Sequence, residues 1–248
     1  MSLLKKVDEI KVEYRDREQI LDFIEKIPEK TFILEVPKDA IFDENLVEAF
    51  AEKIEIILEL PSMDLSVIQW CKEKNIKWYW KYPITSYFEL RKLAALGPSY
   101  LLLGAPLCFD LPTVKKIGIP IRLIANLAGD RYIPQLEGIC GPWIRPEGIP
   151  AYEPYVDSIE FVSTGLQQEA TLYKIYAEDK EWPGNLNLLF QDFNCNVQNP
   201  GLPTEIDEMR TNCRQKCMEN GHCRFCETGV KFSHALTTYL LEKEENNG

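Results

Sequence analysis

Five cysteines near the C-terminal end of the chain have the residue type and the spacing of a metal site. Cys213, Cys217, Cys223 and Cys226 follow the pattern C-x3-C-x5-C-x2-C, and Cys195 lies upstream as a further cofactor-binding candidate. On a helix, Cys213 and Cys217 share one face because residues four apart are one turn apart. Cys223 and Cys226 form a knuckle of the kind that holds one side of a metal. Four thiolates suit tetrahedral zinc or an iron–sulfur cluster, and the spacing leaves both open.

Two other interpretations of the cysteines remain. A pair of disulfides requires an oxidising compartment. The N-terminal run MSLLKKVDEIKVEYRD has no long apolar stretch, so we expect neither a signal peptide nor a membrane span and expect a cytoplasmic, reducing location. The thiols could also be buried without a metal, as small hydrophobic side chains.

A second set of polar residues lies where predicted strands end. Most of them stand two residues before the proline that closes a strand, or at the equivalent place. The set comprises Glu35, Glu59, Lys81, Asn126, Arg145 and Glu160, with Glu13 or Arg15 from a first strand. Charged residues are uncommon in short apolar strands. Such a group can perform acid–base chemistry, bind a carboxylate or hold a divalent metal. The alternative is that these side chains face helices or water and form ordinary ion pairs.

The elements that must position these residues repeat along the chain. Runs of strand-forming residues stop at prolines 37, 61, 83 and 106, every 22 to 24 residues, and helix-like segments lie between them. A βα unit fits in that length, which predicts βα units on a parallel sheet. Continuing the register gives eight strands: 10–15, 32–37, 56–61, 78–83, 100–106, 121–127, 141–146 and 158–163. The predicted helices are 17–27, 44–53, 65–74, 87–96, 111–117 and 167–180, with a single turn over 148–156.

Eight βα units close into a (β/α)8 TIM-type barrel, in which the chemistry lies at the C-terminal ends of the strands. We therefore predict a small barrel over residues 1–182. An open, doubly wound sheet is the alternative. The composition changes after Trp182, and residues 183–248 are predicted to be a cysteine-rich, metal-binding appendage docked on the barrel, with a helix over 205–219 and an apolar-periodic segment over 230–241. Leu102 and Ile124 are predicted to be buried in the core, and Cys71 to be a buried helix residue.

Charge and motifs exclude several functions. The net charge of −11 argues against an extended nucleic-acid surface, although it leaves local contact with RNA open. The sequence contains no glycine-rich phosphate loop, no serine-nucleophile elbow and no HExxH, so the usual hydrolase mechanisms have no support.

The segments WIRPEGIPAYEPYVDSIEF and PGNLNLL, followed by the clustered cysteines, resemble the collagenase-like peptidase family of barrel proteins. That family includes the anaerobic ubiquinone and RNA hydroxylation proteins, and the resemblance covers about residues 142–226. It implies a barrel, an oxygen-labile [4Fe–4S] cluster and an O2-independent hydroxylation or related redox reaction on a small-molecule or RNA substrate. Peptidase activity has no supporting motif. Two other functions remain. The chain could be a non-catalytic structural or assembly component in which zinc holds the C-terminal appendage in place, or a binding module for a small ligand.

Overall fold

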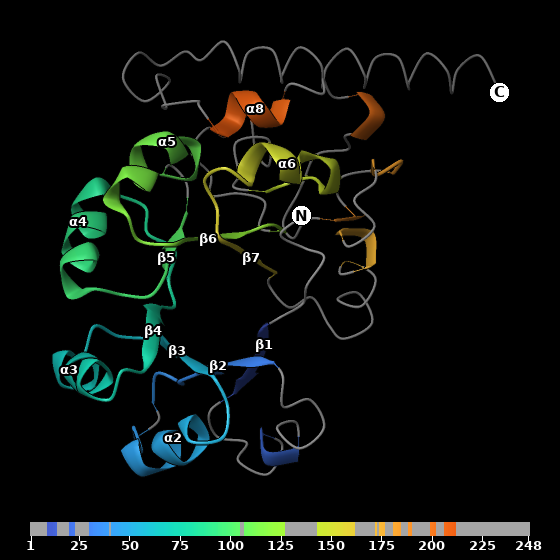
Figure 1. Cartoon of the computed structure of the whole chain (residues 1–248). Coiled ribbons are helices and arrows are strands. Elements are labelled where there is room, and N and C mark those ends of the chain that lie inside the picture. Colours follow the sequence, from blue (N-terminus) through green and yellow to red (C-terminus); the bar gives the residue numbers. More distant parts are fainter. Residues whose placement is uncertain are drawn as a thin grey trace. The chain divides into compact units, whose positions relative to one another are not determined.

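The computed structural model describes a mixed α/β fold built from two compact units, residues 6–102 and residues 1–5 with 103–248 (Figure 1). The described residues are 9–13, 20–22, 30–39, 41–104, 107–126, 143–161, 172, 174–176, 181–184, 188–189, 199–201 and 206–211. Cys195, Cys213, Cys217, Cys223 and Cys226 lie outside them, as do the apolar-periodic segment 230–241 and most of the helices predicted over 17–27, 167–180 and 205–219.

The unit of residues 6–102, here the N-terminal unit, contains a four-stranded parallel sheet. Its strands are β1 (Glu9–Glu13), β2 (Thr31–Glu35), β3 (Ile56–Leu60) and β4 (Lys77–Trp80), and they lie in sequence order. The helices between and after them are α2 (Glu44–Ala51), α3 (Leu65–Glu73) and α4 (Tyr87–Leu96). The predicted strand–helix alternation is confirmed from β2 to α4.

The helices α2, α3 and α4 each begin at a residue whose side chain accepts a hydrogen bond from the first turn. Asp43 accepts from the Leu46 amide at 3.1 Å, and Asp64 accepts from the Ser66 amide at 2.9 Å. Ser86 does the same for α4, which ends at Gly97 in the left-handed conformation with φ of 69°. These caps fix where each strand-to-helix connection ends.

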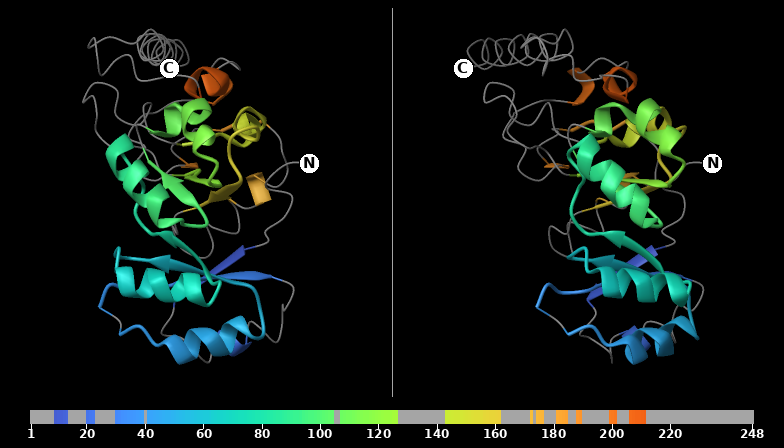
Figure 2. Two further views of the ribbon diagram at one scale, coloured as in Figure 1. Left: turned by 60° about the vertical axis from the view of Figure 1, so that its left-hand side comes forward. Right: turned by 90° about the vertical axis from the view of Figure 1, so that its left-hand side faces the viewer.

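One face of this sheet packs against helices. Right-handed crossovers between consecutive parallel strands place the connecting helices on one side of the sheet. Accordingly, α2 and α3 cover the same face in Figure 2, and the apolar cluster joins strand and helix residues. The strands contribute Val12, Phe32, Leu34, Ile56, Leu58 and Trp78, and the helices contribute Val47, Phe50, Ile68 and Cys71. Because side chains alternate along a strand, the residues between these point to the opposite face.

The second unit, here the C-terminal unit, contains shorter elements. After β5 (Leu101–Leu103), at the division between the units, come η2 (Leu107–Phe109), α5 (Leu111–Val114), η3 (Lys115–Ile117) and β6 (Ile121–Ile124). They are followed by η5 (Pro146–Gly148), α6 (Ile149–Tyr152), β7 (Ser158–Glu160), η7 (Asn199–Gly201) and α8 (Ile206–Thr211). The strand order is β5-β6-β7, and β6 and β7 are parallel.

The strand predicted over 141–146 is wrong for the residues that the structure describes. Trp143–Arg145 has no strand structure, and β7 pairs directly with β6. Proline lacks a backbone donor and fixes φ, and prolines stand at 142, 146 and 150, so a ladder cannot continue through this segment. Pro146 instead begins η5, and the single helical turn predicted within 148–156 is confirmed as α6.

The predicted core positions are confirmed. Leu102 and Ile124 are 1% and 6% exposed, and Cys71 is fully buried on α3. No helix that the structure describes has the length and apolar character needed to cross a membrane.

Candidate functional site

Polar side chains gather at the carboxyl ends of β2, β3 and β4, on the sheet face opposite α2 and α3. Glu13, Glu35, Glu59 and Tyr79 are neighbours in register across the four strands. The ladder continues one step past β4, because the Lys81 amide donates to the Leu60 carbonyl at 2.9 Å. We call Lys11, Glu35, Glu59, Tyr79 and Lys81 the strand-end group.

Glu59 lies at the centre of the strand-end group and is 1% exposed. Its Oε1 accepts hydrogen bonds from Lys11 Nζ at 2.7 Å and from Tyr79 Oη at 2.8 Å. Its Oε2 is buried and has no hydrogen-bond partner among the described residues. A buried carboxylate oxygen without a donor costs about 1–3 kcal/mol or more, so a ligand that supplies a donor recovers that cost.

Lys81 and Glu35 form the second ion pair of the group. Lys81 Nζ bonds Glu35 Oε1, and their side chains are 32% and 30% exposed. Burial lowers the pKa of Lys81, but the hydrogen bond to Glu35 and the charges of Glu35 and Glu59 outweigh it, and the net pKa is raised. Lys81 is therefore a persistent cation beside two carboxylates.

In the C-terminal unit, the predicted residues Asn126 and Glu160 lie at the end of the β6–β7 pair. Arg122 and Glu160 approach to 3.6 Å between Nη1 and Oε2, and the Ala125 amide donates to the Glu160 carbonyl at 2.9 Å. Arg122 and Asn126 are both fully buried. Arg122, Ile124 and Asn126 alternate along β6 and its extension, which places the two polar side chains on one face.

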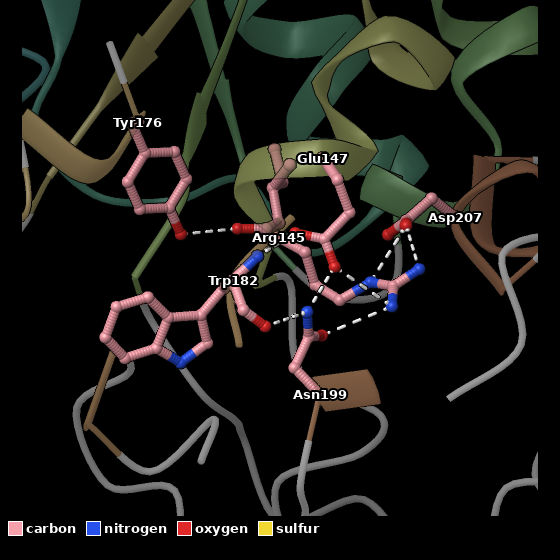
Figure 3. Close-up of polar contacts among 7 residues, drawn as sticks. Arg145, Glu147, Tyr176, Trp182, Asn199 and Asp207 are labelled. Carbon is pink, nitrogen blue, oxygen red and sulfur yellow. Dashed lines mark hydrogen bonds and ion pairs between the residues drawn. The ribbon is translucent and has the colours of Figure 1, made fainter. Parts of the chain in front are cut away.

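Arg145 belongs to a different group, which Figure 3 shows in close-up. We call this group the Arg145 clamp; it comprises Arg145, Glu147, Trp182, Asn199 and Asp207. Arg145 donates to one oxygen of Asp207, from Nε at 3.0 Å and from Nη2 at 2.6 Å, and from Nη1 to Asn199 Oδ1 at 3.2 Å. Glu147 Oε1 lies 3.2 Å from Arg145 Nη1 and also accepts from Asn199. The Asn199 amide group donates further to the Trp182 carbonyl at 2.8 Å.

The Arg145–Asp207 ion pair of the Arg145 clamp is buried, and this burial shifts the pKa of Asp207. Arg145 and Asp207 are both 3% exposed. Burial raises the pKa of Asp207, and the charges of Arg145 and Arg210 oppose that rise. Gly148 makes room for Asp207, since a Cβ at position 148 would lie 2.4 Å from Asp207 Cγ. These contacts hold α8 against the segment that follows β6.

Two further contacts fix that segment. Tyr176 Oη donates to the Ile144 carbonyl at 2.5 Å, and the fully buried Arg210 guanidinium lies 3.6 Å from the ring centre of Trp143. Burial raises the pKa of the Tyr176 hydroxyl well above its ordinary value, so it remains a donor. Residues 143–147 thus contact three stretches that are distant in the sequence, at Tyr176, at Asn199 and on α8.

The structure brings Glu35, Glu59 and Lys81 together, and it gives Arg145 other partners. Sequence reasoning missed Lys11, Arg122 and the hydrogen bond from Tyr79 to Glu59. Lys11 and Arg122 are charged residues inside apolar strands, the same signal that identified Glu59. Among the described residues, no group of three or more His, Cys, Asp and Glu side chains is arranged to hold a metal.

Comparison with protein-family models and with curated proteins finds no match. Among solved structures, the chain is similar to a cube-shaped, highly porous protein cage designed by fusing symmetric oligomeric domains. That match has 11% sequence identity and a TM-score of 0.43, and it covers 99% of this chain and 75% of the other.

Proposed function

We propose that the strand-end group is the substrate-binding and acid–base site of an enzyme that acts on a small molecule. The observation that carries this proposal is Glu59: a buried carboxylate at the carboxyl end of a parallel strand, with one oxygen held by two donors and the other without one. The carboxyl ends of parallel strands are where α/β enzymes bind their ligands.

Each residue of the group has a role in this proposal. Lys11 and Tyr79 hold Oε1 and thereby orient the carboxylate, leaving Oε2 to accept a proton or a hydrogen bond from the substrate. Lys81 is the fixed cation that stabilises negative charge developing on a bound substrate. Its raised pKa keeps it protonated through the neutral range.

The order of the strands supports the predicted barrel as the complete architecture. A doubly wound sheet reverses its strand order and has helices on both faces, whereas β1 to β4 run in sequence order with α2 and α3 on one face. In a closed barrel of βα units, even one that lacks the strand predicted over 141–146, the opposite face with its polar residues becomes the interior. Slow hydrogen exchange at the amides on the outer edge of β1 is the expected result, and rapid exchange there contradicts closure.

The resemblance of residues 142–226 supports the reaction class, an O2-independent hydroxylation or related redox reaction. The donor set of Cys213, Cys217, Cys223 and Cys226 fits an iron–sulfur cluster or zinc, because four thiolates suit either. A cluster there would supply one-electron transfer, and zinc would supply structural stability. A brown protein containing iron and sulfide after anaerobic purification supports the redox class; a colourless zinc protein contradicts it.

Glu59→Gln tests the proposal, because it keeps the shape of the side chain and removes its charge. The anaerobically purified protein is incubated with a small-metabolite extract, in parallel samples with a chemical electron acceptor and with a chemical reductant. The acceptor takes the two electrons that hydroxylation by water releases, and consumed compounds are followed by mass spectrometry. Loss of the acid–base group is expected to slow consumption about 10²–10⁴-fold. The matched control is Glu55→Gln, at the other end of the strand, whose side chain is 54% exposed and pairs with Lys77. Equal consumption by wild type and Glu59→Gln contradicts the proposal.

The same experiment addresses the non-catalytic alternatives. In the strand-end group, Lys11 pairs with Glu59 and Lys81 with Glu35, an arrangement that a structural or ligand-binding protein also tolerates. A structural component consumes no compound in any variant. A binding module retains a compound without altering it, and Glu59→Gln releases that compound.

A further inference from the structure

Large apolar side chains are exposed at one end of the N-terminal unit. They lie in the three connections that lead from β2, β3 and β4 into the following helices, or in the first turn of those helices. Together we call them the apolar rim: Ile41, Met63, Leu65, Tyr82, Tyr87 and Phe88, exposed by 91%, 37%, 65%, 43%, 40% and 69%.

The opposite end of the same unit lacks such residues. The connections from helices into β3 and β4 contain Ile54 and Ile76, which are 7% and 8% exposed. Within the described part of residues 6–102, every exposed large hydrophobic residue therefore lies at the strand-end side. Scattered apolar residues on a surface are ordinary, but a set confined to one end of a sheet marks a binding surface.

The charges at this end favour a cation. The connections 36–43, 61–64 and 81–86 contain Asp39, Asp43 and Asp64 against Lys38 and Lys81, and Lys81 is already bonded to Glu35. Hydrogen bonds from Ser66 lower the pKa of Asp64, which keeps it ionised. A surplus of negative charge around a site attracts cationic ligands.

The position of Glu59 supplies the specific contact. Its Oε2 is buried without a donor among the described residues, and Met63 of the apolar rim follows four residues later in the chain. A ligand donor at Oε2 has its strongest interaction with the carboxylate when the donor itself is charged.

We propose that the site takes a small cationic amine with an apolar body, whose ammonium group donates to Glu59 Oε2 and whose body lies on the apolar rim. This inference rests on the proposed function and deepens it by assigning the substrate class. The apolar rim supplies affinity through buried area, and Glu59 supplies selectivity for the cation.

Calorimetry with three probes tests the assignment. Phenethylamine carries both features, phenethyl alcohol lacks the positive charge, and ethylamine lacks the apolar body. The wild-type protein is expected to bind phenethylamine about tenfold or more tightly than either of the others. If phenethyl alcohol binds as tightly as phenethylamine, the site does not recognise a positive charge. If ethylamine binds as tightly as phenethylamine, the apolar rim does not contribute to binding.

Variants assign the two contacts. Glu59→Gln is expected to abolish the preference for phenethylamine over phenethyl alcohol. The double variant Tyr82→Ser/Phe88→Ser is expected to weaken phenethylamine binding about tenfold, while Leu188→Ser leaves it unchanged. Leu188 is a matched control because it is 71% exposed, close to the 69% of Phe88, and lies outside the apolar rim.

The two proposals fail in different ways. If the Tyr82/Phe88 variant binds phenethylamine like the wild type, or wild type shows no preference for it, the substrate class is wrong. The proposed function still stands in that case if Glu59→Gln slows consumption of a compound from the extract. If Glu59→Gln leaves both consumption and probe binding unchanged, both proposals are overturned.

Discussion

Arg145 and Asp207 are 62 residues apart in the sequence, and the guanidinium places two donors on a single oxygen of the carboxylate. The other oxygen of Asp207 is buried and has no hydrogen-bond partner among the described residues. The pair is therefore incompletely satisfied, and its members depend on each other more than an exposed pair does.

Removing one member of this pair is expected to be costly. Asp207→Ala removes the carboxylate that accepts two hydrogen bonds from the buried Arg145 guanidinium and leaves only Glu147 as a countercharge. It should reduce the free energy of unfolding by about 3–5 kcal/mol, measured by urea denaturation. The apolar replacement of both, Arg145→Met/Asp207→Leu, should cost less than the sum of the single changes. Lys115→Met is the control, because Lys115 and Asp157 are each 39% exposed and such pairs contribute at most about 1 kcal/mol. If Asp207→Ala also lowers the free energy of unfolding by at most about 1 kcal/mol, the Arg145 clamp does not stabilise the fold as a buried ion pair should.

Gly148→Ala should destabilise the protein by about 1–3 kcal/mol, because the added methyl group overlaps the Asp207 carboxylate. In an Asp207→Ala background the carboxylate is gone, so the same change should cost little. The two costs are compared by urea denaturation in a double-mutant cycle. Equal costs in both backgrounds would show that the close approach has no energetic consequence.

The buried strand residues Leu102 and Ile124 give a test of the core. Truncation of either to Ala should lower the free energy of unfolding by about 2–5 kcal/mol, because apolar contacts are lost and a cavity remains. Leu188→Ala, at a side chain that is 71% exposed, should change it by about 0.5 kcal/mol or less. Losses that small at both core positions would mean that these strands are peripheral.

The buried thiol of Cys71 should make the free energy of unfolding depend on pH. Burial raises the pKa of its thiol to about 12. The unfolded chain loses this proton near pH 8.5, whereas the folded chain retains it, so the unfolded state binds fewer protons above about pH 8.5. The free energy of unfolding should therefore fall as pH rises from about 8.5 to 10, less steeply in Cys71→Ala than in wild type. The native thiol should also resist alkylation at pH 8, because the thiolate is the reactive form. Rapid alkylation of Cys71 in the folded protein is the contrary result.

The cysteine site is tested by metal content. Cys213→Ser, Cys217→Ser, Cys223→Ser and Cys226→Ser should each lower the bound metal, measured by elemental analysis, and increase proteolysis of the C-terminal segment, because metal binding supplies local folding energy. Cys71→Ser should leave metal content unchanged, since Cys71 is a buried residue of α3. Unchanged metal in all four variants excludes the proposed ligand set.

Local signals explain why much of the N-terminal unit could be predicted. The strands β2, β3 and β4 end close to a proline, and the helices α2, α3 and α4 begin at a capping residue. Both features are visible in the sequence without tertiary contacts. Glu35 and Glu59 stand at the same distance from their prolines, and the structure confirms that they are register neighbours. Lys81 was expected beside Glu59, but Tyr79 occupies that place. The offset is two residues, and because the strand period is also two, Lys81 still points to the predicted face.

Long-range contacts explain what the sequence did not show. Arg145 occupies a strand-end position in the sequence pattern, yet its partners Asn199 and Asp207 lie 54 and 62 residues further along. No periodicity relates such distant positions. Lys11 likewise reaches Glu59 across an intervening strand, a contact that depends on strand order and side-chain length.

The position of Asp207 on α8 also sets a limit on how far the polypeptide can be shortened from its C-terminus. A chain that ends after Thr211 keeps the partners of Arg145 and the stacking of Arg210 on Trp143. A chain that ends at residue 205 loses both and leaves the Arg145 guanidinium buried without Asp207. A stable protein therefore requires at least the residues of α8, and domain fusions at this end should be joined beyond Thr211.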